Sequence, residues 1–192
     1  MGQPSQKPKR PTPRLSKQRR SAQSLIELTL VVVVLLVLMF GLIDFGRAIY
    51  MQQVITNLTR EGANLASRGP GDTRTEIISN AVAAVIASAS PLSITTNGVV
   101  IITAVTNNAR GSFFINEQQK KGALTDNSKV GTRVGGTATL PPTSPFPPLS
   151  QSNHTVYVAE IYYKYTPITP IGKFLKITLP TRLYDAAYFA TF

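Results

Sequence analysis

Residues 25–43 are LIELTLVVVVLLVLMFGLI, and this stretch decides how the chain is organised. Fifteen of its positions are Leu, Ile, Val or Phe, and only Glu27 and Thr29 are clearly polar. An α-helix of this length spans about 28 Å, close to the roughly 30 Å thickness of a bilayer core. The favourable insertion of so many apolar side chains outweighs one carboxylate near the end of the segment. We therefore predict a transmembrane helix over residues 23–43.

The segment before the apolar run is basic. Residues 1–22 hold seven Lys or Arg and no acid, whereas the rest of the chain has 13 basic and 9 acidic residues. Such an asymmetric flank is typical of the cytoplasmic side of a membrane helix. We predict a disordered cytoplasmic leader over 1–22, with residues after 43 on the outer side. Charge concentrated in a Pro-containing tail does not favour a nucleic-acid partner.

A signal peptide that is removed entirely is the alternative interpretation of the apolar run. The apolar region of such a peptide usually has 7 to 15 residues and ends in small residues suited to cleavage. This run is longer, and Asp44-Phe45-Gly46-Arg47 follows it. The pattern therefore favours an anchor that is retained.

The helical pattern continues beyond the apolar run. Residues 44–68 contain no Pro, and Gly69-Pro70-Gly71 is a strong helix stop. We predict one helix from about Leu25 to Ser67, whose outer half, 44–68, continues beyond the membrane on the outer side. Its expected apolar stripe consists of Phe45, Ile49, Ile55, Leu58 and Leu65.

The remaining residues, 72–192, predict a small α+β domain. A capping box at Thr73 to Glu76 opens a second helix over Arg74 to Ala89, with Ile77, Ile78, Val82 and Val85 on its buried side. The residues between Asn116 and Asn153 are rich in Pro and Gly and predict a mobile loop. An antiparallel sheet of three to five strands is expected from the remaining β-branched and apolar stretches, which are 99–105, 112–115, 155–165, 177–179 and 183–189.

The stretch Thr155 to Tyr165 (TVYVAEIYYKY) alternates clearly between two faces. We expect the face that carries Tyr157, Ala159, Ile161, Tyr163 and Tyr165 to be the core side.

The sequence offers little for catalysis. There is no Cys, and His154 is the only His, so thiolate chemistry is excluded and a zinc site is not expected. No Gly-x-Ser-x-Gly motif accompanies His154. We predict no enzyme activity, no cofactor and no metal. Asp44 and Arg47 lie three residues apart at the outer end of the apolar helix, where they predict a local ion pair, with a docking role for this motif as the alternative.

Three stretches together resemble a known family. They are Gln23 to Glu27 (QSLIE), Gly41 to Arg47 (GLIDFGR) and Val158 to Pro170 (VAEIYYKYTPITP). They resemble TadE-like pseudopilins of the tight-adherence (Flp) pilus system of bacteria. The resemblance covers about half of the chain, and residues 116–153 match no pattern of the family.

The resemblance implies leader processing between Ala22 and Gln23 by a prepilin peptidase, which would leave Glu27 as the fifth residue. The leader of this family usually ends in Gly, and here Ala22 stands in its place. The resemblance further implies that Glu27 pairs with the new N-terminal amine of a neighbouring subunit during assembly.

The implied function is that of a non-catalytic minor pseudopilin. Its expected partners are the membrane, the peptidase, other pilin-like subunits and an inner-membrane assembly platform. The expected location is the bacterial inner membrane, with a periplasmic C-terminal domain. Two alternatives remain at this point: an unprocessed single-pass protein whose outer domain binds a cell-envelope partner, and a membrane-tethered hydrolase that uses His154.

Overall fold

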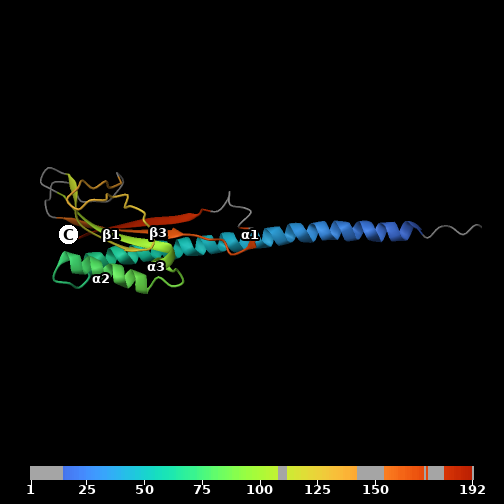
Figure 1. Cartoon of the computed structure of the whole chain (residues 1–192), viewed down its shortest axis with the longest axis horizontal. Helices are drawn as coiled ribbons and strands as arrows, with labels where there is room; N and C mark the ends of the chain where they lie inside the picture. Colours follow the sequence, from blue (N-terminus) through green and yellow to red (C-terminus); the bar gives the residue numbers. More distant parts are fainter. Residues whose placement is uncertain (1–14, 108–111, 142–153, 171, 173–179, 192) are drawn as a thin grey trace, which may run out of the picture.

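A computed structural model describes residues 15–107, 112–141, 154–170, 172 and 180–191, with side chains from residue 22 onward. One very long helix, α1 (Leu15–Arg68), forms the axis of the molecule, and its C-terminal half packs on a four-stranded sheet (Figure 1). A second helix, α2 (Arg74–Ala87), lies beside α1 on the same side of the sheet. The N-terminal half of α1 projects away from this domain (Figure 1).

The helix α1 begins ten residues earlier than predicted. It starts at Leu15, so the last eight residues of the predicted disordered leader are helical, and that part of the prediction is wrong. No Pro follows Pro13 in this segment, and its Lys, Arg, Gln, Leu and Ala residues are good helix formers. Because the apolar helix downstream is already formed, these residues only extend it and do not bear the cost of nucleation.

The sheet is entirely antiparallel, in the order β2-β1-β3-β4. Its strands are β1 (Gly98–Asn107), β2 (Phe113–Gly122), β3 (Thr155–Lys164) and β4 (Arg182–Thr191). The short helix α3 (Ile94–Asn97) leads into β1. The predicted α+β class, with a long N-terminal helix and a small antiparallel sheet, is confirmed.

The strand β2 is longer than expected and occupies the start of the predicted loop 116–153. Residues from Asn116 to Gly122 are strand, paired with β1, so they do not belong to a loop. Their polar composition hid the strand, but polar and charged side chains are what an exposed edge strand tolerates. Residues 142–153 of the predicted loop and the predicted strand 177–179 lie outside the described residues. The predicted strand 183–189 corresponds to β4.

The capping interactions of α2 follow the sequence pattern only in part. The Thr73 hydroxyl accepts a hydrogen bond from the Glu76 backbone N–H (3.3 Å), as a capping box requires. The Glu76 carboxylate, however, accepts from the N–H of Asp72 (3.2 Å). The helix therefore has both of its N-terminal interactions, one of them displaced by one residue.

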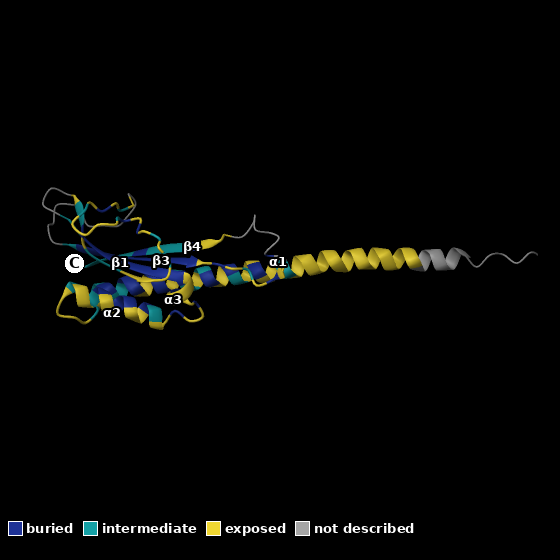
Figure 2. Ribbon diagram, viewed as in Figure 1, coloured by how far each residue is buried: buried dark blue, intermediate teal, exposed yellow. Residues whose placement is uncertain are grey.

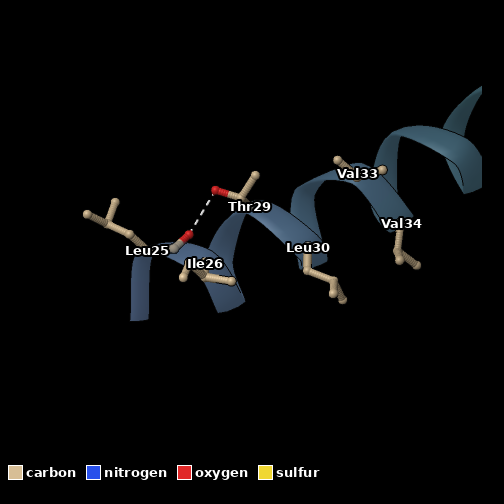
Figure 3. A pocket seen from close by; sticks show the side chains of 6 residues that line it. All are labelled: Leu25, Ile26, Thr29, Leu30, Val33 and Val34. Carbon is tan, nitrogen blue, oxygen red and sulfur yellow. Dashed lines mark hydrogen bonds between the residues drawn. The ribbon is translucent and has the colours of Figure 1, made fainter. Parts of the chain in front are cut away.

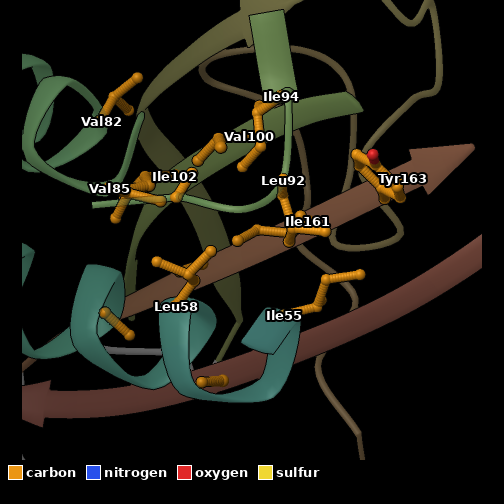
Figure 4. Packing of buried hydrophobic residues seen from close by; sticks show 14 of the residues in the cluster. Ile55, Leu58, Val82, Val85, Leu92, Ile94, Val100, Ile102, Ile161 and Tyr163 are labelled. Atoms are coloured by element: carbon orange, nitrogen blue, oxygen red, sulfur yellow. The ribbon is translucent and has the colours of Figure 1, made fainter. Parts of the chain in front are cut away.

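The main core lies between the two helices and the inner face of the sheet. Ile55 and Leu58 of α1 share one buried cluster with Val82 and Val85 of α2, where the two helices pack closely together on the sheet (Figure 4). Gly62 allows this close approach, because a Cβ atom there would lie 2.8 Å from Val85 Cγ2. The expected tyrosine-bearing face of β3 belongs to this core, so that prediction is confirmed.

The opposite face of the sheet is buried as well, which the sequence did not indicate. Val156 and Val158 of β3 pack with Val105 and Ile115 under the segment that follows β2. Both faces of β3 are therefore covered, as expected for an inner strand with a layer on each side.

Candidate functional site

The exposed half of α1 has the properties of a membrane span. Every side chain from residue 22 to residue 39 is exposed, while burial begins near residue 44, where the helix meets the domain (Figure 2). Within the described part of the chain this is the one helix long and apolar enough to cross a membrane. The Thr29 hydroxyl donates to the Leu25 carbonyl (2.8 Å), so this polar group is satisfied within the helix (Figure 3).

Figure 3 shows the apolar surface that surrounds Thr29. Leu25, Ile26, Leu30, Val33 and Val34 all belong to α1, and no second element forms a wall around them. Such a one-sided surface suits lipid tails or a neighbouring helix better than a small ligand, which needs to be enclosed.

The residues of the predicted processing site lie in this exposed half. Ala22, Gln23 and Glu27 are on one continuous helix, and all three side chains are exposed. Gln23 precedes Glu27 by four residues, about one helical turn or 6 Å along the axis.

Asp44 marks the point where α1 meets the domain, and its carboxylate is almost completely buried (1 % exposed). Its Oδ1 accepts hydrogen bonds from the backbone N–H of Ile168 (3.0 Å) and of Thr169 (3.3 Å). Its Oδ2 accepts from the Thr169 hydroxyl, and its backbone carbonyl accepts from the Tyr165 hydroxyl (2.8 Å). We call Asp44, Tyr165, Ile168 and Thr169 the Asp44 latch.

The latch replaces the local ion pair predicted for Asp44. The described residues contain no salt bridge between Asp44 and Arg47, and Arg47 Nη1 is buried without a hydrogen-bond partner among them. Phe45 and Gly46 are exposed. Within the Asp-Phe-Gly-Arg motif, Asp44 makes the direct contacts to the residues that follow β3. Arg47 acts on the latch through its charge.

The charges at the latch favour an ionised Asp44. Burial alone would raise the pKa of Asp44, but the hydrogen bonds from Thr169 and Ile168 and the charge of Arg47 together hold this pKa below its ordinary value. Burial and the neighbouring Asp44 charge raise the pKa of the Tyr165 hydroxyl. At neutral pH Tyr165 is therefore a protonated donor and Asp44 a charged acceptor.

Gly172, which has a helical backbone conformation, supports the latch. Its N–H donates to the Thr169 hydroxyl oxygen (3.2 Å), which orients that hydroxyl toward Asp44. A Cβ atom at this position would overlap both Asp44 Oδ2 and Pro167 Cβ. Only glycine fits here without displacing the loop.

The model of the TadE-like protein family matches residues 22–64. This segment is TadE-like. The predicted resemblance is thus confirmed over 43 of the 192 residues, and neither a curated protein nor a solved structure matches the chain.

The TadE-like segment lies entirely within α1 and includes Ala22, Gln23, Glu27 and the motif from Asp44 to Arg47. The other members of the latch, Tyr165, Ile168 and Thr169, lie outside the match. The fold therefore joins the TadE-like helix to the Tyr- and Pro-containing stretch that also suggested the resemblance.

A second buried carboxylate, Glu160, lies on the face of β3 opposite the main core. It is fully buried, and it accepts hydrogen bonds from the Ser128 hydroxyl, the Lys129 N–H (2.9 Å) and the Tyr184 hydroxyl (3.0 Å). It thereby holds the segment after β2 against the sheet. The sequence signal for this buried site is a single Glu between apolar residues in the middle of a strand.

The tyrosines around Glu160 have raised pKa values. Burial, followed by the charge of Glu160, raises the pKa of Tyr162 to about 12 and also raises the pKa of Tyr184. Both hydroxyls have acceptors, because Tyr162 donates to the Asn127 carbonyl (3.0 Å) and Tyr184 donates to Glu160. Glu160 and its hydrogen-bond donors therefore act as a structural anchor for the segment after β2.

His154, the candidate for the hydrolase alternative, lies 3.2 Å from the Thr191 carbonyl through Nδ1. The described residues include no group of three His, Asp or Glu side chains that could hold a metal ion. TadE-like, pilus-associated proteins are generally not enzymes.

Proposed function

We propose that this chain is a non-catalytic minor pseudopilin that acts in the assembly of a tight-adherence (Flp) pilus or a related secretion machine. The observation that carries the proposal is that the TadE-like segment is a single helix with two different halves. Residues 22–43 present apolar side chains outward, and residues 44–64 are packed into a folded domain. A membrane anchor rigidly continuous with a soluble domain is what a subunit needs in order to leave a bilayer for a helical assembly.

The proposed orientation follows from charge. Seven basic residues and no acid precede Gln23, which favours a cytoplasmic N-terminus and a periplasmic domain at the bacterial inner membrane.

We propose that a prepilin peptidase cuts between Ala22 and Gln23. Both side chains are exposed on α1, and Ala22 is small enough for a site that selects against bulk. The cut would create a cationic α-amino group about one turn before Glu27.

Glu27 is the proposed assembly residue. A carboxylate inside the apolar segment is costly to place in lipid unless it meets a partner. The N-terminal amine of a neighbouring pilin-like subunit would be such a partner, and the inner-membrane platform would bring the two together. The apolar helix surface around Glu27 would then pack laterally in the assembly.

A Glu27→Gln variant tests this role, because it removes the charge and keeps the shape. We expect normal membrane insertion and loss of the chain from the assembled complex, measured by co-purification with sheared filaments. Glu61→Gln is the matched control, because Glu61 is an exposed acid on the soluble half of the same helix. Equal incorporation of the two variants would refute the pairing role.

The second candidate function is that of an unprocessed membrane protein whose outer domain binds an envelope partner. The observation that favours it is Ala22 at the position where the resemblance implies Gly. In that case the leader stays attached and Glu27 never meets an amine.

A further inference from the structure

The exit of α1 from the domain is surrounded by exposed apolar side chains. Leu42 is 73 % exposed, Phe45 is 56 % exposed, and Ile43 is also exposed. Successive residues of an α-helix point about 100° apart, so these three side chains point in different directions around the helix. Asp44, at the same level, is the one residue that would interrupt this apolar surface with a charge.

The Asp44 latch places the apolar side chain of Ile168 beside Asp44, on the side of the helix that would otherwise carry only the charge. The Ile168 backbone N–H is bonded to Asp44, which fixes Ile168 at the level of Asp44 along the helix. The Ile168 side chain is nevertheless 62 % exposed, and Pro167 directly precedes it in the chain. The backbone N–H groups of Ile168 and Thr169 bind Asp44, while the Ile168 side chain faces outward. Ile168 therefore does not contribute to the core of the domain.

The length of the apolar segment places this level at the edge of a bilayer. Residues 25–43 span about 28 Å as a helix, so a span that is filled by these residues ends one residue before Asp44. The exposed Tyr50 follows within two turns, in the region where Tyr side chains favour the lipid headgroups.

We propose that Ile168 and its loop rest in the boundary between headgroups and acyl chains of the bilayer that α1 crosses. The occupant of this apolar surface is thus phospholipid, continuous with the lipid around residues 25–43. The Asp44 latch then fixes the height of the domain above the membrane, because one side of the helix carries a loop that enters the interface. The proposal requires that α1 spans a bilayer, and it is independent of whether the chain enters a pilus.

The chain has no Cys, so a single Cys can be placed and labelled without other changes. Ile168→Cys keeps the latch, because the backbone of residue 168 makes the contact with Asp44. The full chain, reconstituted in vesicles of phosphatidylcholine and phosphatidylglycerol, would carry an environment-sensitive fluorophore at this Cys. Quenching by nitroxide lipids measures the depth of the label, and quenching by iodide measures its exposure to water.

Val134→Cys is the matched control, because Val134 is also an exposed aliphatic residue (53 %). It lies near Ile115, at the sheet end opposite Tyr163 and the latch. Leu35→Cys, in the middle of the apolar segment, reports whether α1 spans the bilayer.

We expect the label at 168 to lie about 15 Å from the bilayer centre, half the thickness of the apolar core. It should be quenched by shallow nitroxide lipids and at least severalfold less by iodide than the label at 134. Equal iodide quenching at 168 and 134 would overturn the proposal, and so would equal lipid quenching at both, because the loop would then have no special position. A water-exposed label at 35 would overturn it together with the membrane span, whereas a buried label at 35 with a water-exposed label at 168 would overturn this inference alone.

Discussion

Thr169 donates both its backbone N–H and its hydroxyl to the carboxylate of Asp44, across 125 residues of sequence. This contact ties the C-terminal loop to the residue at which the apolar helix enters the domain. Because the backbone N–H of Ile168 binds the same carboxylate, one side chain organises the end of the domain nearest the anchor.

Asp44→Ala should destabilise the domain. The substitution leaves the N–H groups of Ile168 and Thr169 without their charged acceptor, at a cost of about 2–3 kcal/mol. Unfolding of the full chain in detergent, followed by near-ultraviolet circular dichroism, measures the change. Glu61→Ala removes an exposed carboxylate from the same helix and should change stability by less than about 0.5 kcal/mol. Equal effects of the two variants would show that the latch contributes nothing.

The latch should also make stability depend on pH in the acid range. The pKa of Asp44 is below its ordinary value of 3.8 in the folded chain, so its contribution is fully present well above pH 3.8 and is lost as pH falls through the folded pKa. Asp44→Asn should therefore lose stability at neutral pH and show a flatter decline than the parent chain below about pH 4. Parallel acid-unfolding curves for the two chains would contradict this assignment.

Two glycines near the latch should respond in opposite ways to substitution by Ala. Gly172→Ala places a methyl group against Asp44 Oδ2 and Pro167, and overpacking of this kind costs about 1–3 kcal/mol. At Gly46 a Cβ atom meets nothing within 4 Å, so Gly46→Ala should stabilise the helix by about 0.5–1 kcal/mol. Thermal unfolding of both variants checks the pair, and a neutral Gly172→Ala would argue against this close contact.

The anchor at Glu160 can be tested through the ionisation of its tyrosine neighbours. Glu160→Gln removes the charge that, after burial, raises the pKa values of Tyr162 and Tyr184, so both tyrosines should ionise at lower pH. An absorbance titration of tyrosinate measures this. The variant should also lose about 1–3 kcal/mol of stability, because an amide cannot accept all three donors. An unchanged titration would contradict the placement of Glu160 beside these rings.

Local patterns were sufficient for much of the fold. The absence of Pro between Leu15 and Arg68, the cap at Thr73 and the alternation from Thr155 onward reflect forces that act within a few residues. The same patterns misplaced part of the buried stripe on α1. Phe45 and Ile49 are exposed, while Ala48 and Met51 are buried. Apolar periodicity does not distinguish a surface that meets lipid or a partner from one that meets a core.

The latch and the Glu160 centre could not be predicted from local patterns. Asp44 and Thr169 were both in stretches that suggested the TadE-like resemblance, but nothing in either stretch shows that the two meet. Asp44 has Arg47 as a nearby opposite charge in sequence, which favoured a local pair. Folding instead brings three donors to the carboxylate, and that arrangement exists only after β3 and α1 are packed together.

The N-terminal residue of the mature protein tests the pseudopilin account most directly. Mass spectrometry of the chain from purified membranes or sheared filaments should find Gln23 as the first residue, with residues 1–22 removed. An intact leader that begins at Met1 in the assembled protein would contradict the account, because Glu27 would then have no N-terminal amine of this kind to meet.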